Sequence, residues 1–239
     1  MAGLVKKYLF LYNIVQFGGW TYILYLLAAH FHAGGWSSQS LIGVWQHVGW
    51  WVTLFQFGAV LEIVHSLVGF VKTPVATTFV QVFSRVACVT LAILVPTTND
   101  HWAMSLMLTA WGITEVVRYL FYALSLYDAV PYILGWLRYT LFIILYPSGV
   151  TGETGTIIAS LPYVKETGLW SITMPNALNV SFNLYYTLIG SLAFYVIGLP
   201  WLYTYMLGQR KRFIQSGGVT KKPATSSVTS SPSSAKKQN

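Results

Sequence analysis

The chain has 239 residues, of which 55% are hydrophobic and only 8% are charged. An ordinary soluble domain carries roughly 25% charged residues, so this composition excludes a surface covered mainly by water. The net charge of +8 comes from the two ends of the chain, where two lysines precede position 8 and seven Lys and Arg residues follow position 209. Terminal basic clusters are typical of membrane-flanking segments. A nucleic-acid-binding surface would need a basic stripe on a folded face, so we predict no nucleic-acid partner.

Six stretches are apolar and long enough to approach the roughly 20 residues of a membrane-spanning helix. In chain order they are Tyr8–Ala29, Leu41–Leu61 (extending towards Phe70), Val75–Val95, Trp102–Leu126, Pro131 to at least Tyr146, and Phe182–Leu207. In the fifth stretch Pro147 and three glycines predict irregular backbone, which is tolerated at membrane depth only where protein or a water-filled cavity surrounds it. We therefore predict an all-α, polytopic membrane protein whose residues 1–214 form one bundle of six transmembrane helices.

The Lys and Arg residues of the short loops predict the orientation of this bundle. Both ends of the chain and Lys72 fall on one side of six alternating spans, whereas the loops His30–Ser40 and Pro96–His101 lack Lys and Arg and fall on the other. Only Lys165 departs from this pattern. Both termini are therefore expected in the cytosol, and Tyr146 is expected towards the lumenal end of the fifth span.

Residues 215–239 differ from the rest in being rich in Ser, Thr, Pro and Lys. This composition predicts a disordered cytosolic tail. Its last four residues, Lys236-Lys237-Gln238-Asn239, resemble the dilysine retrieval signal of endoplasmic reticulum membrane proteins. A multi-pass protein of the endoplasmic reticulum membrane is the corresponding prediction.

Six ionisable residues fall inside the predicted spans, where a charge at the bilayer centre costs at least about 2.5–3.5 kcal/mol. They are Glu62, Arg85, Glu115, Arg118, Arg138 and Glu153. Three acids match three arginines, which predicts a paired network inside the bundle. Helical spacing places Glu115 and Arg118 on one face with two tyrosines, and Gln81 on one face with Arg85. Such a network either only fixes helix packing or takes part in chemistry, and both interpretations stay open.

Metal-binding and disulfide chemistry are not indicated. Cys88 is the only cysteine, so an intramolecular disulfide is excluded. The pair Glu62 and His65 alone has the spacing of metal ligands, and one such pair is a weak signal. No metal site is predicted.

A phenol and a carboxyl group flank the Pro/Gly segment, at Tyr146 and Glu153. In a regular helix they would lie about 10.5 Å apart along the axis. On a continuous fifth helix, Arg138 would fall with both of them within a sector of about 80°. A carboxylate can act as a general base and a phenol as a general acid. The alternative interpretation is a helix end with a Pro/Gly turn and a lumenal glutamate.

The segment Tyr146-Pro147-x-Gly149-x-x-x-Glu153 resembles the active-site segment of the very-long-chain (3R)-3-hydroxyacyl-CoA dehydratases, also called protein tyrosine phosphatase-like proteins. Other stretches match this family in the same order: Leu11-Tyr12-Asn13 with Gly19-Trp20, residues 62–69, residues 81–85 and residues 115–119. The resemblance implies a six-span enzyme of the endoplasmic reticulum that catalyses the third step of each fatty-acid elongation cycle. In this step, water is removed from a (3R)-3-hydroxyacyl-CoA to give the trans-2-enoyl-CoA.

The resemblance also implies which residues act. It assigns the catalytic pair to Tyr146 and Glu153, with either division of acid and base between them. It assigns supporting roles to Glu62, Gln81, Arg85, Arg118, Arg138 and Gly149, and the helical spacing above adds Glu115. It implies no cofactor. The implied partners are a long-chain 3-hydroxyacyl-CoA, membrane lipid, and the condensing enzyme and reductases of the elongation cycle.

Two other functions compete with the dehydratase. His65-Ser66-x-x-Gly69-x-x-Lys72 can be aligned with the phosphatase pattern H-C-x-x-G-x-x-R, but Ser66 and Lys72 replace the nucleophilic Cys and the phosphate-binding Arg, which removes both chemical parts. A non-enzymatic membrane scaffold or lipid-binding protein of the elongation machinery would not need Tyr146 and Glu153. A transporter would be indicated by inverted repeats, and none is visible in the sequence.

Overall fold

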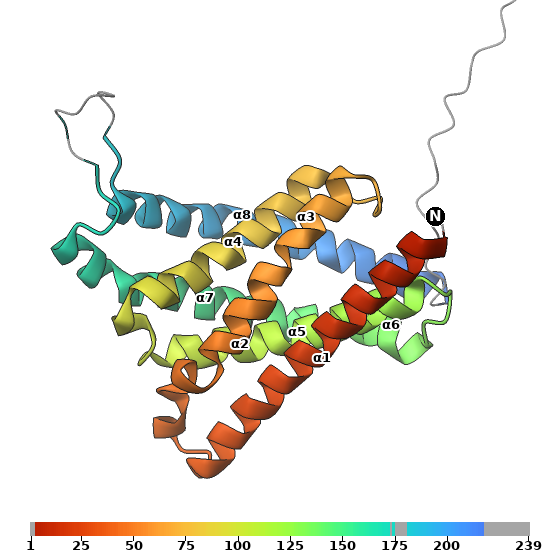
Figure 1. Cartoon of the computed structure of the whole chain (residues 1–239), viewed down its shortest axis with the longest axis horizontal. Helices are drawn as coiled ribbons and strands as arrows, with labels where there is room; N and C mark the ends of the chain where they lie inside the picture. Colours follow the sequence, from red (N-terminus) through yellow and green to blue (C-terminus); the bar gives the residue numbers. More distant parts are fainter. Residues whose placement is uncertain (1–2, 173, 175–180, 218–239) are drawn as a thin grey trace, which may run out of the picture.

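The computed structural model describes residues 3–172, 174 and 181–217, and Figure 1 shows their arrangement. Apart from one isolated bridge between Ile172 and Phe182, the elements in this part of the chain are helices. In order they are α1 (Gly3–Ala33), the 3-10 helix η1 (Ser38–Leu41), α2 (Val44–Gly58), α3 (Val60–Leu67), α4 (Val75–Leu94), the 3-10 helix η2 (Pro96–Thr98), α5 (Trp102–Ser125), α6 (Tyr132–Arg138), α7 (Phe142–Thr167) and α8 (Leu184–Gln215).

The all-helical prediction is confirmed, and several helices are long and apolar enough to cross a membrane. Five candidate spans meet this criterion: Gly3–Ala33, Ser38–Leu67, Val75–Leu94, Tyr132–Thr167 and Leu184–Gln215. The predicted fourth span corresponds to α5, which is 24 residues long. It is not among the five because Glu115 and Arg118 lower its mean hydropathy. The chain is thus a multi-pass helical membrane protein.

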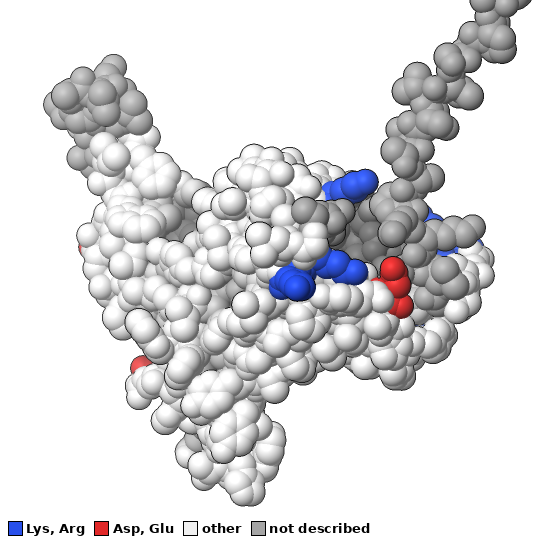
Figure 2. Space-filling view, turned by 45° about the vertical axis from the view of Figure 1, so that its right-hand side comes forward, with Lys and Arg blue, Asp and Glu red and all other residues white. Residues whose placement is uncertain are grey.

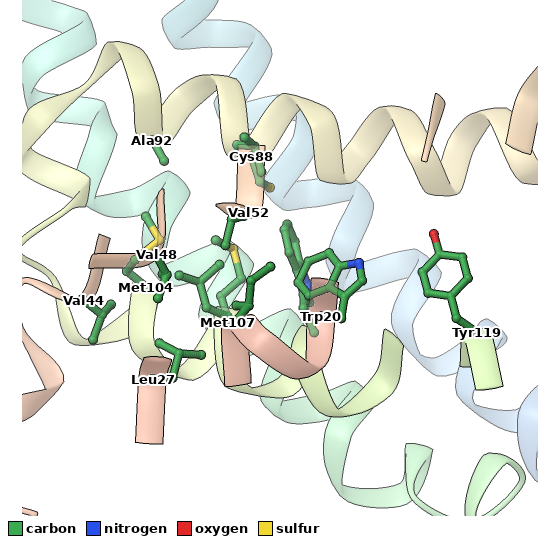
Figure 3. Close-up of a cluster of buried hydrophobic side chains, with 14 residues drawn as sticks. Trp20, Leu27, Val44, Val48, Val52, Cys88, Ala92, Met104, Met107 and Tyr119 are labelled. Atoms are coloured by element: carbon green, nitrogen blue, oxygen red, sulfur yellow. The ribbon is translucent and has the colours of Figure 1, made fainter. Parts of the chain in front are cut away.

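Helix α5 is the centre of the bundle and packs along both α1 and α7. Side chains from α1, α2, α4 and α5 meet in a continuous core, shown in Figure 3, which includes Trp20, Val48, Cys88 and Met107. The outside is apolar as well: Val196, for example, is 75% exposed on α8. In Figure 2, charged side chains cover only a small part of the visible face. A bundle that is apolar both inside and outside requires lipid around it.

The predicted break at Pro147 is wrong, because α7 runs through Pro147 and Pro162 without interruption. Its glycines permit a close approach to α5. A Cβ atom added at Gly152 would lie 2.5 Å from the backbone nitrogen of Met107, and one at Gly155 would lie 2.7 Å from Ala103 Cβ. Small residues let membrane helices pack backbone to backbone, and neighbouring helices make Pro and Gly tolerable within a span. Packing against α5 therefore outweighs the low helix propensity of this segment.

The first residues of α1 and the last of α8 lie at the same end of the bundle, next to α6 (Figure 1). Lys6 Nζ lies 4.2 Å from the centroid of the Tyr127 ring, and Phe213 stacks on Tyr139 at 4.7 Å between ring centroids. Tyr146 lies in the second turn of α7. It is therefore nearer the end that holds both termini, and its expected position at the opposite end of the fifth span is wrong. The error arose because the Pro/Gly segment was interpreted as the end of this span.

Candidate active site

Four charged side chains form a buried ionic network between α3, α4 and α5. The Arg118 guanidinium donates to both oxygens of Glu62 at 2.9 Å, and through Nε to Glu115 Oε2 at 2.7 Å. Arg85 donates to the other oxygen of Glu115. Only 2% of the Glu115 side chain is exposed, and 16–23% of the other three. Two carboxylates and two guanidiniums thus neutralise one another, as ions removed from water require.

Helix α5 organises this network through its helical spacing, as predicted. Glu115 and Arg118 are three residues apart and share a face with Tyr119. The Tyr119 hydroxyl donates to Glu62 Oε1 at 2.5 Å and accepts from Arg118 at 2.9 Å. The network links α3 and α4 to the central helix α5, and it therefore helps to fix the positions of these two helices.

Arg138 lies outside this network. It is the last residue of α6, and Tyr139 to Leu141 separate it from α7, so the condition of one continuous helix with Tyr146 and Glu153 is not met. Its Nη2 donates to the Tyr122 hydroxyl at 3.2 Å, and its guanidinium lies 4.6 Å from the centroid of the Phe121 ring. It has no carboxylate partner among the described residues. Its positive charge is therefore stabilised by aromatic faces and a phenol.

Of the three acids inside the predicted spans, Glu153 is the one that forms no salt bridge with a described residue. Trp111 Nε1 of α5 donates to its Oε1 at 2.8 Å, and the Tyr195 hydroxyl of α8 donates to its Oε2 at 2.5 Å. The expected pairing of three acids with three arginines is therefore wrong: among the described residues two acids and two arginines share three salt bridges, and Glu153 and Arg138 lie apart from them. A half-buried carboxylate held only by neutral donors keeps its capacity to accept a proton.

Trp111 connects Glu153 to the ionic network. The Arg85 guanidinium lies over the Trp111 ring, 5.0 Å from its centroid. Trp111 precedes Glu115 by four residues, so the spacing on α5 could have indicated that it faces the same side. Tyr195 gave no comparable signal, because it lies in an apolar stretch 42 residues beyond Glu153.

Tyr146 and Glu153 lie on one face of α7, since seven residues make almost two turns. The Tyr146 ring is half-buried, 6.3 Å from the Tyr203 ring of α8, and its hydroxyl makes no hydrogen bond within the described residues. Gly149 lies between the pair on the same face. A Cβ atom there would be 3.9 Å from Ala110 Cβ, which is ordinary contact. Gly149 therefore adds no side chain between the phenol and the carboxylate, whereas Val150, four residues after Tyr146, does.

Gln81 is also a predicted site residue that lies apart from the ionic network and from Glu153. It is exposed on α4, and its side chain makes no hydrogen bond to the described residues. The phosphatase-like segment has structural contacts instead: His65 Nε2 is hydrogen-bonded to the Tyr8 hydroxyl at 2.9 Å, and Ser66 Oγ to Thr73 at 2.8 Å. Among the described residues, no three His, Cys, Asp or Glu side chains are grouped as a metal site would require.

Fold and site together define a multi-pass helical membrane protein with a neutral ionic network beside a carboxylate held by an indole and a phenol. Residues 56–216 match the sequence model of the protein tyrosine phosphatase-like proteins, PTPLA. Together with the similarity to curated proteins described below, this match shows that the chain belongs to that family. No solved structure is significantly similar to the chain.

The curated relatives are similar over almost the whole chain. The very-long-chain (3R)-3-hydroxyacyl-CoA dehydratase hpo-8 of Caenorhabditis elegans is 43% identical over 220 residues, which cover 91% of this chain and 98% of the relative. Very-long-chain (3R)-3-hydroxyacyl-CoA dehydratase PASTICCINO 2 of Arabidopsis thaliana is 41% identical, with 89% and 96% covered. Very-long-chain (3R)-3-hydroxyacyl-CoA dehydratase 2 of Homo sapiens is 40% identical, with 88% and 82% covered.

Proposed function

We propose that this protein is a very-long-chain (3R)-3-hydroxyacyl-CoA dehydratase, a hydro-lyase of fatty-acid elongation. The relatives that carry this name match about nine tenths of its length. Within the site, the proposal rests on the surroundings of Glu153. It is a carboxylate inside a membrane bundle with no cation to neutralise it among the described residues, on the same helix face as the phenol of Tyr146.

In the proposed reaction, Glu153 accepts the proton from C2 of the substrate. The electron pair of the broken C2–H bond forms the C2=C3 double bond. The C3–O bond breaks, and the hydroxyl group leaves as water with a proton donated by Tyr146. Proton transfer from the Glu153 carboxyl to the Tyr146 phenolate, directly or through solvent, restores both groups. This division of labour matches the ordinary state of the two kinds of group at neutral pH, at which a carboxyl group is ionised and a phenol carries its proton.

The substrate is proposed to lie along α7, over Gly149. Its CoA moiety lies at the end of the bundle that holds the termini, where Arg138 has no carboxylate partner and Arg210 Nε is 3.4 Å from Thr140 Oγ1. Guanidinium groups of this kind suit phosphate oxygens. The acyl chain points the other way, where an apolar cluster from α4, α7 and α8 lies beyond Glu153. This cluster includes Leu91, Val95, Ile157, Val164, Leu188 and Leu192.

The proposal includes the finer topology and the location. Six spans are proposed, with α5 as the fourth. Both termini are proposed to be cytosolic, which agrees with the proximity of the α1 and α8 ends and gives cytosolic acyl-CoA access to Tyr146. Residence in the endoplasmic reticulum is part of this proposal. The predicted dilysine signal at Lys236-Lys237 lies outside the described residues, together with the rest of the predicted tail beyond Gly217. The condensing enzyme and reductases of the elongation cycle are the proposed partners.

The test is the reaction itself. Detergent-purified protein, incubated in a lipid environment with a long-chain (3R)-3-hydroxyacyl-CoA, is expected to form the trans-2-enoyl-CoA. Tyr146→Phe and Glu153→Gln are each expected to lower kcat by about two to four powers of ten while the protein stays folded, the range typical of general acid–base groups. A folded wild type that forms no enoyl-CoA from any chain length would contradict the proposal and favour a scaffold.

A further inference from the structure

The Glu153 carboxylate is held at both oxygens by donors from two different helices. Trp111 Nε1 approaches Oε1 from α5, and the Tyr195 hydroxyl approaches Oε2 from α8. A glutamate side chain on its own rotates about its terminal torsion, which has a broad and shallow preference. One donor on each oxygen, from separate backbones, removes this rotation and fixes the plane of the carboxylate.

We infer that Tyr195 and Trp111 are positioning residues of the dehydratase, which hold the Glu153 carboxylate in the orientation that accepts the C2 proton. The inference rests on the proposed function and extends it to two residues outside the catalytic segment. Each oxygen keeps a second lone pair, so the two hydrogen bonds leave the carboxylate able to accept a proton. Charge-assisted hydrogen bonds of this kind combine strength with a defined geometry.

The backbone under Glu153 is fixed from the same side. The adjacent residue, Gly152, packs against the α5 backbone at Met107, one turn from Trp111. Helix α5 therefore fixes both the position of the glutamate backbone and one oxygen of its carboxylate. The indole of Trp111 is itself buried between Arg85 and Glu153, so its ring has little freedom to move.

Tyr195 supplies the hydrogen bond to the second oxygen of the Glu153 carboxylate, from α8. Helix α8 packs mainly on α7, and Phe213 is its only residue that is buried within the described chain. The Tyr195 ring packs against the apolar cluster around Leu91 and Ile157, and its hydroxyl points to Glu153. A phenylalanine would keep the ring in that cluster and would lose only the donor. The role of the hydroxyl can thus be separated from the role of the ring.

The experiment compares three variants of the full-length protein, purified and assayed with a long-chain (3R)-3-hydroxyacyl-CoA. Tyr195→Phe and Trp111→Phe each remove one donor, and Trp111→Phe keeps an aromatic ring beneath Arg85. Tyr186→Phe on α8 is the matched control, because Tyr186 is 70% exposed and its side chain makes no hydrogen bond to the described residues. Each donor variant is expected to lower kcat roughly 10- to 100-fold with KM within about twofold of wild type, because a hydrogen bond to a charged group is the interaction lost.

A substrate deuterated at C2 distinguishes positioning from a general loss of folding. If Glu153 is misaligned, breaking of the C2–H bond becomes slower, and the isotope effect on kcat stays at or above the wild-type value. The control should retain wild-type kcat and isotope effect. Donor variants with kcat within twofold of wild type would overturn the inference, as would a loss of kcat that only follows the folded fraction. A wild type without activity would instead overturn the proposed function. If Tyr195→Phe fails to fold, Trp111→Phe decides the question by itself.

Discussion

The guanidinium of Arg85 lies 5.0 Å from the centroid of the Trp111 ring, and the same indole donates its N–H to Glu153. One side chain thus faces the neutral ionic network with its ring and the candidate base with its edge. The cation is attracted to the electron-rich face of the ring, and the carboxylate accepts the N–H at its electron-poor edge. The network and the base thus share the Trp111 side chain, although no ion pair joins them among the described residues.

The buried network should respond strongly to the loss of a single partner. Glu115→Ala leaves Arg85 and Arg118 facing each other without the carboxylate that both contact, and removal of one member of a buried ion pair typically costs about 3–5 kcal/mol. We expect a clear fall in the midpoint of thermal unfolding in detergent. Glu166→Gln, an exposed change on α7, should leave the midpoint unchanged. Equal midpoints for the two variants would show that the network contributes little to stability.

The glycines of α7 should differ in their tolerance of a methyl group. Gly152→Ala places Cβ against the Met107 backbone, which cannot move aside, and overpacking of this kind typically costs about 1–3 kcal/mol. Gly149→Ala has ordinary contacts and should be stable. A larger side chain, as in Gly149→Leu, would press on Ala110 and Trp111 of α5 and should lower both the midpoint of thermal unfolding and the activity. Thermal unfolding and enoyl-CoA formation, measured on the same preparations, separate the two effects.

Tyr146 can be tested against the tyrosine beside it. Tyr203 lies 6.3 Å away between ring centroids, on α8, and offers the same chemical group from another helix. Tyr146→Phe should lower kcat by about two powers of ten or more, as expected for the loss of a general acid. Tyr203→Phe should change kcat by less than a factor of about three if Tyr146 is the acid. The opposite ranking would transfer the role to Tyr203.

Several features of the fold could be predicted because they depend on composition and local periodicity. The boundaries of α4 and α5 follow their apolar stretches, and spacing alone placed Glu115 and Arg118 on one face. The path of α7 could not be predicted in this way. Pro147, Gly152 and Gly155 lower helix propensity, and only the tight packing on α5 explains why the helix continues. The partners of the charged residues could not be predicted either. The equal numbers of acids and arginines in the spans suggest three pairs, but which residues pair depends on the distances between helices.

The site shows the same distinction between local and tertiary information. Trp111 could have been placed near the network from its position four residues before Glu115. The contact between Tyr195 and Glu153 depends on how α8 lies against α7, and no periodicity within either helix encodes it. Arg138 would share a helix face with Glu153 only on a continuous helix. The turn at Tyr139 to Leu141 instead directs it to Tyr122.

Arg138 provides the final prediction, which concerns recognition of the substrate. If its guanidinium binds CoA phosphates, Arg138→Gln should raise KM for a 3-hydroxyacyl-CoA by roughly tenfold, the usual value of a charge-assisted hydrogen bond. The same variant should show an unchanged KM for the corresponding acyl-pantetheine, which has the thioester but no phosphate. Lys165→Gln, at the other end of α7, serves as a control for the loss of one positive charge. An equal rise in KM for both substrates would show that Arg138 acts on the fold or on the thioester, because the pantetheine arm and acyl chain are common to the two molecules.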